Sequence, residues 1–281
     1  MSVWACMPVG GVTVRRGSAA TAAFVLPMAC ACGAAAATGG EYPFALGDYS
    51  CPVTTNLAGA DALRVQGWFD KGMSWAAGLH REEGIVCFER ALELDPSCAM
   101  AHWAIAFCHG PHYNMNGDRY VGLSRQADGF PSMPTAFAHA QQAKAALTEA
   151  CSGTETALIN ALLARYVDEL PANDTDGNVV LTTNAAMDRL NRAFVSACRE
   201  AANVAPDDAE LAWCLTEALM NCRPWQLWDV NTGEQAPETP EIVETLTRGL
   251  ALSPRHPALC HLAIHCCELH KQPPPRSNMF F

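Results

Sequence analysis

The chain has 281 residues, of which 50% are apolar and 17% are charged. This composition is typical of a globular protein of one or two domains with a sizeable core. Its 29 acidic and 18 basic residues give a net charge of −11. Nucleic acids and anionic membranes are bound by clustered Lys and Arg, so we expect no nucleic-acid partner.

Residues 1–40 contain no acidic residue, and Arg15 and Arg16 precede a long Ala-rich run without charge. This pattern is typical of a secretory or organelle-targeting peptide. The alternative is a disordered tail on a cytoplasmic protein. Pro27 and Gly33 interrupt the run and no later stretch is apolar for long enough, so we expect no transmembrane span.

The rest of the chain predicts helices in pairs and no strand. Residues 41–59 are expected to form a linker, 60–270 a helical solenoid, and 271–281 a disordered tail. Ser97 is expected to cap the third helix, and Asp207 to start the helix that ends near Asn221. The expected helices are 61–79, 81–94, 97–108, 134–150, 154–167, 185–203, 207–221, 239–253 and 257–270.

Residues 65–98 carry small, aromatic and proline residues at set offsets. The small residues are expected where two antiparallel helices cross closely, the aromatic ones fill the gaps, and the proline ends the second helix. The positions are Trp68, Gly72, Trp75, Gly84, Phe88, Ala91 and Pro96. Their order is that of the tetratricopeptide repeat. We therefore predict an all-α fold of TPR-like antiparallel helix pairs stacked into a right-handed superhelix.

The phrase ALELDPSCAMAHWAIA recurs loosely as AANVAPDDAELAWCLT later in the chain. Trp103 and Trp213 stand at the same offset after Pro96 and Pro206. This is internal repetition of a degenerate kind, as expected for stacked helical repeats.

Several phrases in combination resemble one family of large TPR domain-containing proteins from bacteria and algae. They are FERALELDPSCAMAHWAIAFCHGPHYN at 88–114, ALLARY at 161–166, EALMNCRPWQLW at 217–228, EIVETL at 241–246 and HPALCHLAIHCCEL at 256–269. Family members usually continue into further repeats, whereas this chain reads KQPPP after its last phrase, and Ala263 stands where an aromatic residue is usual. The resemblance implies the N-terminal half of the family architecture, and it implies a fold more than a function.

The chain has 14 cysteines. A disulfide scaffold is one reading, but such chains are short and rich in loops. Many of these cysteines fall inside expected helices, at positions that suit a small apolar side chain: Cys87, Cys98, Cys108, Cys198, Cys214, Cys260 and Cys266. We therefore expect free and mostly buried thiols.

The last expected helix carries a candidate metal site. His261, His265 and Glu268 are spaced i, i+4 and i+7, which places them on one face of a helix. Two histidines at this spacing can chelate a metal ion, and the carboxylate can add a third ligand. The alternative is that these side chains line a groove and bond to neighbouring helices.

Two long loops, at 111–133 and 222–237, carry most of the candidate binding residues. Each loop follows the first helix of a pair. They are expected to meet the last helix at one rim and to form a polar pocket, where Arg binds a carboxylate and aromatic rings stack. The alternative is that the loops lock onto each other, with Trp225 packed as a plug. The candidates are His109, His112, Tyr113, Asn114, Arg223, Trp225 and, at the start of the last helix, His256.

No phosphate loop, nucleophile elbow or HExxH motif occurs in the sequence, so no catalytic residue is assigned. We expect a non-catalytic scaffold, without a cofactor, that binds a partner protein or peptide on its concave face. The alternative is an enzyme or metal-binding protein whose His/Glu pocket is formed by the last helix and the two long loops.

The final helix, 257–270, carries apolar residues on more than one face, and the sequence provides no partner helix after it. We therefore expect an exposed apolar patch here. It would serve as a homo-oligomer contact, or reflect a truncated gene product or a splice form.

Overall fold

The computed structural model describes residues 42–115, 120, 130–168 and 183–268, and in this part of the chain all regular structure is helical. The long helices belong to one compact unit that begins at Leu46. They are α1 (Gly59–Ala77), α2 (Arg81–Leu94), α3 (Ala99–Cys108), α5 (Met133–Ala145), α6 (Gly153–Leu163), α7 (Thr183–Val204), α8 (Ala209–Asn221), α9 (Thr239–Leu252) and α10 (Pro257–Cys267). The all-α prediction is confirmed. The expected targeting segment 1–40 and tail 271–281 lie outside the described residues.

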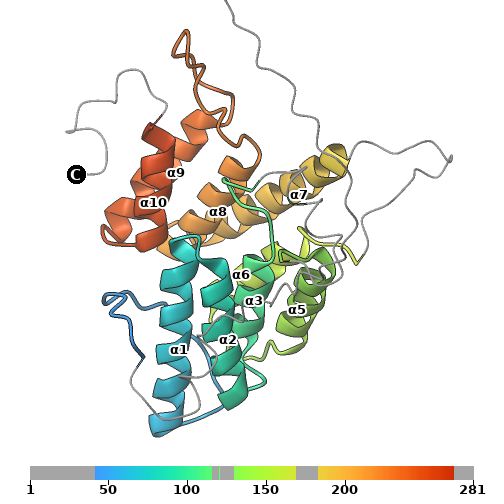
Figure 1. The fold of residues 1–281 in the computed structure, drawn as a ribbon, viewed down its shortest axis with the longest axis vertical. Coiled ribbons are helices and arrows are strands. Elements are labelled where there is room, and N and C mark those ends of the chain that lie inside the picture. The colour runs from blue at the N-terminus through green and yellow to red at the C-terminus, as the bar shows by residue number, and fades with distance from the viewer. Residues whose placement is uncertain (1–41, 116–119, 121–129, 169–182, 269–281) are drawn as a thin grey trace, which may run out of the picture. The chain divides into compact units, whose positions relative to one another are not determined.

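The helices pack as successive pairs (Figure 1). Helix α1 packs on α2, α3 on α5, α6 on α7, and α8 on α9. The second helix of each pair also packs on the first helix of the next. The first helices touch in turn from α1 through α3, α6 and α8 to α10, and α10 touches α1 as well. This last contact joins the two ends of the helical series.

The crossing of α1 and α2 depends on small residues, as the repeat pattern predicted. A Cβ on Gly72 would overlap the ring of Phe88, lying 2.7 Å from its Cδ1 atom. A Cβ on Gly84 would lie 3.1 Å from the carbonyl oxygen of Gly72. Phe88 is fully buried and its ring packs at 5.4 Å from that of Phe69. The helices approach this closely because neither glycine carries a side chain.

Three joints between consecutive helices share one geometry, at Pro96, Pro206 and Pro254. In each, the residue before the proline donates its N–H to the carbonyl four residues earlier. The carbonyl of that same residue then accepts from the N–H of the second residue after the proline. The bonds are Asp95–Ala91 (2.9 Å) and Cys98–Asp95 (3.0 Å), Ala205–Ala201 (3.2 Å) and Asp208–Ala205 (3.3 Å), and Ser253–Gly249 (2.9 Å) and His256–Ser253 (3.1 Å). The internal repeat seen in the sequence includes the first two joints but not the third.

The same register explains why the third joint was missed. Trp103 and Trp213 each lie seven residues after their proline, and His261 holds that place after Pro254. The two tryptophans are buried and meet edge to face, with ring centroids 6.1 Å apart. Because the third copy carries a histidine instead, its sequence does not look like a repeat.

The helix caps differ from the sequence prediction at two places. Ser97 does not cap α3, because the helix begins at Ala99 and Cys98 holds the N-cap position. Ser97 lies one residue before the cap, and its hydroxyl donates to the Asp95 carboxylate at 2.5 Å. Asp208, not Asp207, caps α8 by accepting from the N–H groups of Glu210 and Leu211.

The described cysteines are free thiols and most of them are buried, as expected. The sulfur atoms of Cys198 and Cys214 lie 3.5 Å apart, between α7 and α8. Burial raises the pKa of Cys108 and of Cys266 to about 12. These thiols therefore pack as small apolar side chains.

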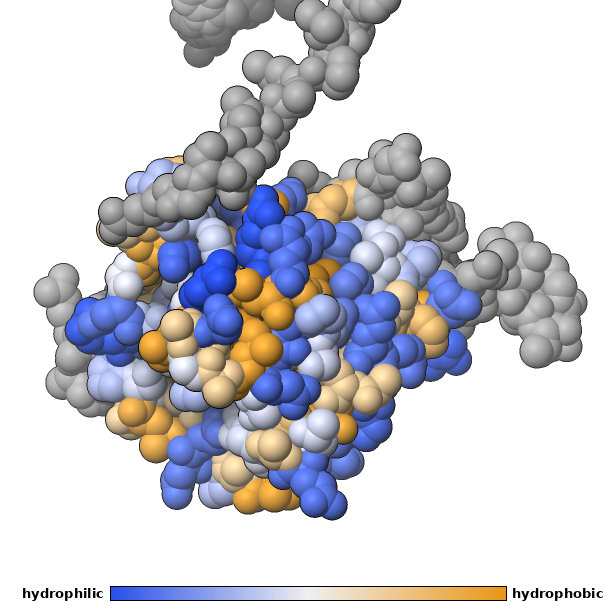
Figure 2. Space-filling model, turned by 90° about the horizontal axis from the view of Figure 1, so that it is seen from below, coloured by the Kyte–Doolittle hydropathy of each residue, from blue (hydrophilic) through white to orange (hydrophobic). Residues whose placement is uncertain are grey.

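On the face seen from below, hydrophobic residues form small groups among hydrophilic ones (Figure 2). Ile264 on α10 is 64% exposed, while its neighbours His265 and Cys266 are buried. The homo-oligomer contact through this helix stays a prediction. In the part of the chain that the structure describes, no helix has the length and apolar character to cross a bilayer.

We predict that Gly72→Ala lowers the free energy of unfolding by about 1–3 kcal/mol, because the new methyl group overpacks against Phe88. Gly67 lies in the same helix, and a Cβ there would meet only Lys71 Nζ at 3.8 Å. Gly67→Ala should therefore be neutral or stabilise by up to about 1 kcal/mol. Urea unfolding of both variants measures this, and equal effects at the two sites would contradict the close crossing.

Candidate functional site

Helix α10 presents two histidines and a glutamate as a connected chain of polar contacts. The Nε2 atoms of His261 and His265 lie 3.1 Å apart, and Nδ1 of His265 lies 2.8 Å from Glu268 Oε1. On its other side, Nδ1 of His261 lies 2.6 Å from the carbonyl oxygen of Ala77, at the end of α1. The i, i+4 and i+7 prediction thus placed the three side chains together. Glu268 contacts the outer nitrogen of His265 and not the point where the two rings meet.

These contacts fix the protons of the two rings. A carbonyl oxygen only accepts, so Nδ1 of His261 must donate to Ala77, and Nδ1 of His265 donates to the Glu268 carboxylate in the same way. In neutral rings each Nε2 then has a lone pair and no hydrogen. Two lone pairs that face each other at 3.1 Å are not a hydrogen bond. The pair is satisfied when one further proton or a cation lies between the Nε2 atoms.

The two long loops meet α10 at this point, as the sequence predicted. The ring of Tyr113 lies 5.0 Å from His265 and 5.1 Å from Trp225, and Trp225 lies 5.6 Å from His265. Trp225 is 46% exposed, so it covers the other two rings from the solvent side. This arrangement matches the alternative in which Trp225 packs against the opposite loop, and it also encloses the histidine pair.

A small recess lies beneath these rings. It is lined by both histidines, Tyr113, Glu217 and Leu79, among others, and has space for about one water molecule. The Tyr113 hydroxyl is buried next to the backbone of Trp225. Burial raises the pKa of Tyr113 to about 12.

Backbone strain gathers at the same place. Leu79 and Trp225 have φ values of 61° and 60°, and among the described residues other than glycine only these two are left-handed. Leu79 lines the recess and Trp225 packs over His265. Side chains with a Cβ adopt this conformation at a cost, and such residues cluster at functional sites.

A buried ion pair lies next to the recess, because Glu217, which lines it, pairs with Arg81. The Arg81 guanidinium donates to Glu217 Oε1 at 2.8 Å and to the carbonyl oxygens of Phe107 and Gly110 at 3.1 and 3.0 Å. Arg81 and Glu217 are both buried. The pair therefore joins the start of α2, the end of α3 and the middle of α8, next to Tyr113.

The other predicted site residues lie apart from this cluster. His109 accepts from the Ser132 N–H, Arg223 pairs with Glu238 at 2.8 Å, and His256 caps α10 by accepting from the Leu259 N–H. His112 accepts from the N–H of Asn114 at 3.3 Å, within its own loop. Of the seven binding candidates, only Tyr113 and Trp225 contact the α10 histidines through their rings.

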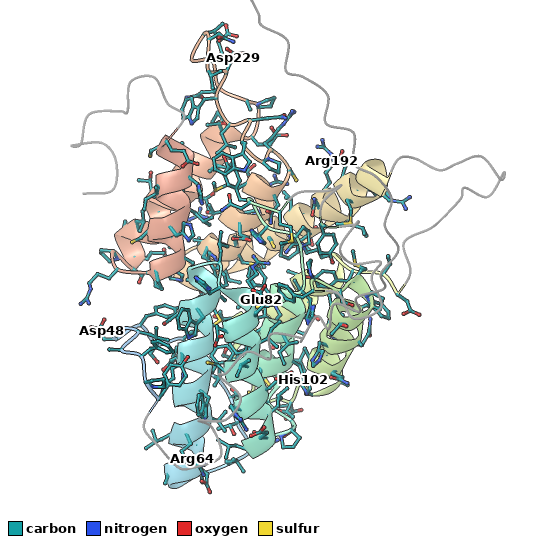
Figure 3. The ribbon with its side chains drawn as sticks, viewed as in Figure 1. Asp48, Arg64, Glu82, His102, Arg192 and Asp229 are labelled. Atoms are coloured by element: carbon teal, nitrogen blue, oxygen red, sulfur yellow. The ribbon has the colours of Figure 1, made fainter. Side chains whose placement is uncertain are left out.

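A second group of histidines was not predicted. His102 on α3 is labelled in Figure 3. Its Nδ1 atom lies 3.1 Å from that of His139 on α5. Burial, together with the neighbouring histidine, lowers the pKa of His139 and of His109 to about 4. These rings are therefore neutral near pH 7 and serve packing between α3 and α5.

Several residues of the site gave no signal in the sequence. Ala77 takes part through its backbone, and Leu79 through its strained turn. Arg81 and Glu217 lie far apart in the chain. The sequence did contain one signal for Glu217. It lies four residues after Trp213, just as Phe107 lies four residues after Trp103 and His265 four residues after His261.

Within the described residues, no group of three or more His, Cys, Asp or Glu side chains is placed to hold a metal ion. A scan against protein-family models, a search of curated proteins and a search of solved structures each found no match to the chain.

We predict that Arg81→Met destabilises the fold by about 3–5 kcal/mol, because it leaves the Glu217 carboxylate buried and unpaired. The matched control is Arg90→Met, at the exposed Arg90–Glu93 pair, which should cost less than about 1 kcal/mol. Denaturant unfolding measures both changes. Comparable losses in the two variants would argue against the buried pair as a structural anchor.

Proposed function

We propose that this chain is a TPR-like helical-repeat scaffold that binds a partner protein or peptide and has no catalytic step of its own. The observation that carries the proposal is the threefold joint at Pro96, Pro206 and Pro254, with one hydrogen-bond pattern. Regular joints of this kind support stacked helix pairs in a superhelix, and such stacks are used as binding surfaces.

The inner face of the first helices offers little room for a partner. Trp103, Phe107 and Trp213 pack there against one another, with ring centroids 5.2–6.1 Å apart. A partner would therefore bind outside these packed rings. We expect an extended segment and not a helix, because an extended segment binds through backbone hydrogen bonds, whereas a helix needs an apolar groove.

Selection of short peptides on the intact chain tests this function. A library of displayed 12-residue peptides is panned on the purified protein, and peptides that also bind serum albumin are discarded. We expect retained peptides to bind with a Kd of about 1–100 µM, which is typical of peptide recognition and equals about −5 to −8 kcal/mol. If no retained peptide binds with a Kd below about 1 mM, the scaffold function is wrong.

A second function is favoured by the histidine pair. We propose that His261 Nε2 and His265 Nε2 bind one divalent metal ion, as an alternative to the shared proton. Two imidazole nitrogens on a tetrahedral Zn²⁺ lie about 3.3 Å apart, close to the 3.1 Å seen here. Glu268 and the Ala77 carbonyl accept from the outer nitrogens, which is how partners of metal-binding histidines orient the rings.

Zinc titration tests this alternative. One equivalent of Zn²⁺ should raise the melting temperature by mass action, and His261→Gln or His265→Gln should abolish the effect. Glu268→Gln should weaken binding by about 10–100-fold, because it removes the carboxylate that orients His265. His80→Gln, at an exposed histidine whose ring packs on Trp75, is the control and should bind as the wild type does. Equal zinc affinity in the His261 and His265 variants would assign the metal to thiols elsewhere.

A further inference from the structure

Residues 48–57 form an extended segment that precedes α1 and lies against several helices. In Figure 3, Asp48 marks its start, beside the ends of α1 and α10. The segment has no helix or strand of its own, and of its residues only Cys51 is fully buried. Hydrogen bonds between its backbone and side chains of the helical unit hold the segment in place.

The first contacts come from α1. The Gln66 side chain accepts from the Val53 N–H at 3.0 Å and donates to the Cys51 carbonyl at 2.8 Å. Its amide thus pairs with the segment as a neighbouring strand would. Asp70, one turn further along α1, accepts from the Cys51 N–H at 3.0 Å. These bonds depend on the backbone of the segment and not on its side chains.

Two further carboxylates continue the series. Glu155 at the start of α6 accepts from the Thr54 N–H at 2.6 Å and from its hydroxyl at 2.7 Å. Asp95, after α2, accepts from the Asn56 N–H at 2.9 Å and from the Thr55 hydroxyl at 2.6 Å. Hydrogen bonds among Asp95, Ser97, Thr55 and Asn56 lower the pKa of the Asp95 carboxyl against the effect of its burial. Both groups accept here as carboxylates, which makes the bonds strong.

The start of the segment is held by α8 and α10. The Tyr49 hydroxyl donates to Glu210 Oε1 at 2.7 Å, and its ring packs edge to face on His256 at 5.0 Å. Asp48 pairs with Arg255 at 2.8 Å, where both side chains are exposed. The segment therefore runs across α10, α8, α1, α6 and the turn after α2.

We propose that this surface is a binding site for extended peptides, and that residues 51–56 occupy it in cis. The proposal rests on the scaffold function proposed above, and names where and how that scaffold would bind. Gln66, Asp70, Asp95 and Glu155 make the same bonds to any extended chain with N–H groups at these positions. A separate peptide that displaces residues 51–56 replaces their hydrogen bonds with an equivalent set. It can therefore compete with this segment while the helices stay folded.

The same contacts define the chemistry of the partner. It is an extended segment with no proline at the positions of Cys51, Val53, Thr54 and Asn56, since each of these donates its N–H. Hydroxyl residues fit at the positions of Thr54 and Thr55. Three carboxylates line the part of the surface under residues 51–56, so the partner carries no acidic side chain at these positions.

The test uses the full chain and a fluorescent copy of residues 48–57, with serine in place of Cys51. Thr54→Pro in the protein removes the N–H that Glu155 accepts and loosens the segment, while every side chain of the site stays in place. We expect the labelled peptide to bind this variant at least about 10-fold more tightly than the wild type. Thr54→Val keeps the N–H and loses only the hydroxyl, so its affinity should lie between the two. A peptide with proline at the Thr54 position should not bind.

The proposal is overturned if Thr54→Pro keeps the wild-type circular dichroism and elution volume and binds the peptide no better. Hydrogen exchange on the wild type gives a second measurement that needs no variant. The amides of Cys51, Val53 and Thr54 should exchange at least about 100-fold faster than those in the middle of α8, through local opening. Equal rates would show that the segment leaves only on global unfolding, and would overturn the proposal.

The peptides selected from the library separate the two proposals. If they bind the wild type and compete with the labelled peptide on Thr54→Pro, both proposals are supported. If they bind but do not compete, the scaffold function stands and this site is wrong.

Discussion

The buried guanidinium of Arg81 is the interaction on which the other contacts of the site depend. Arg81 is the first residue of α2. Its guanidinium donates to the carbonyl oxygens of Phe107 in α3 and of Gly110 just after it, and pairs with Glu217 in the middle of α8. Its plane also packs on the ring of Phe107, 4.8 Å away. A buried charge needs hydrogen-bonding partners nearby, so these contacts hold α2, α3, Gly110 and α8 in one relative position. The Tyr113 loop starts directly after this anchor, and its ring is thereby placed over α10.

The two proposed binding surfaces differ in character. The recess beside His261 and His265 is small, enclosed by rings and bordered by two strained residues, so the proposed ligand there is an ion. The surface under residues 48–57 contacts the backbone of that segment, so the proposed ligand there is an extended peptide. Helix α10 contributes to both, through its first turn at His256 and its last turn at His265.

The sequence predicted much of the fold and part of the site. The helices, the small residues at the crossing of α1 and α2, and the shared face of His261, His265 and Glu268 all follow from local periodicity. The meeting of Tyr113 and Trp225 followed from the expected alternation of helices. The third joint was missed because His261 replaces the repeated tryptophan. The cap at Ser97 was wrong because the helix begins one residue later than the sequence indicated, with Cys98 at the N-cap.

By itself, the sequence determined which segments are helical and which residues share a face, because backbone hydrogen bonds within a helix and the burial of an apolar stripe are local properties. Only the tertiary structure decided that the Ala77 carbonyl meets His261, that Arg81 pairs with Glu217, and that residues 48–57 lie across the helices. Each of these contacts joins polar groups far apart in the chain. Such contacts leave no periodic pattern, because they form where desolvated donors and acceptors happen to be brought together by packing.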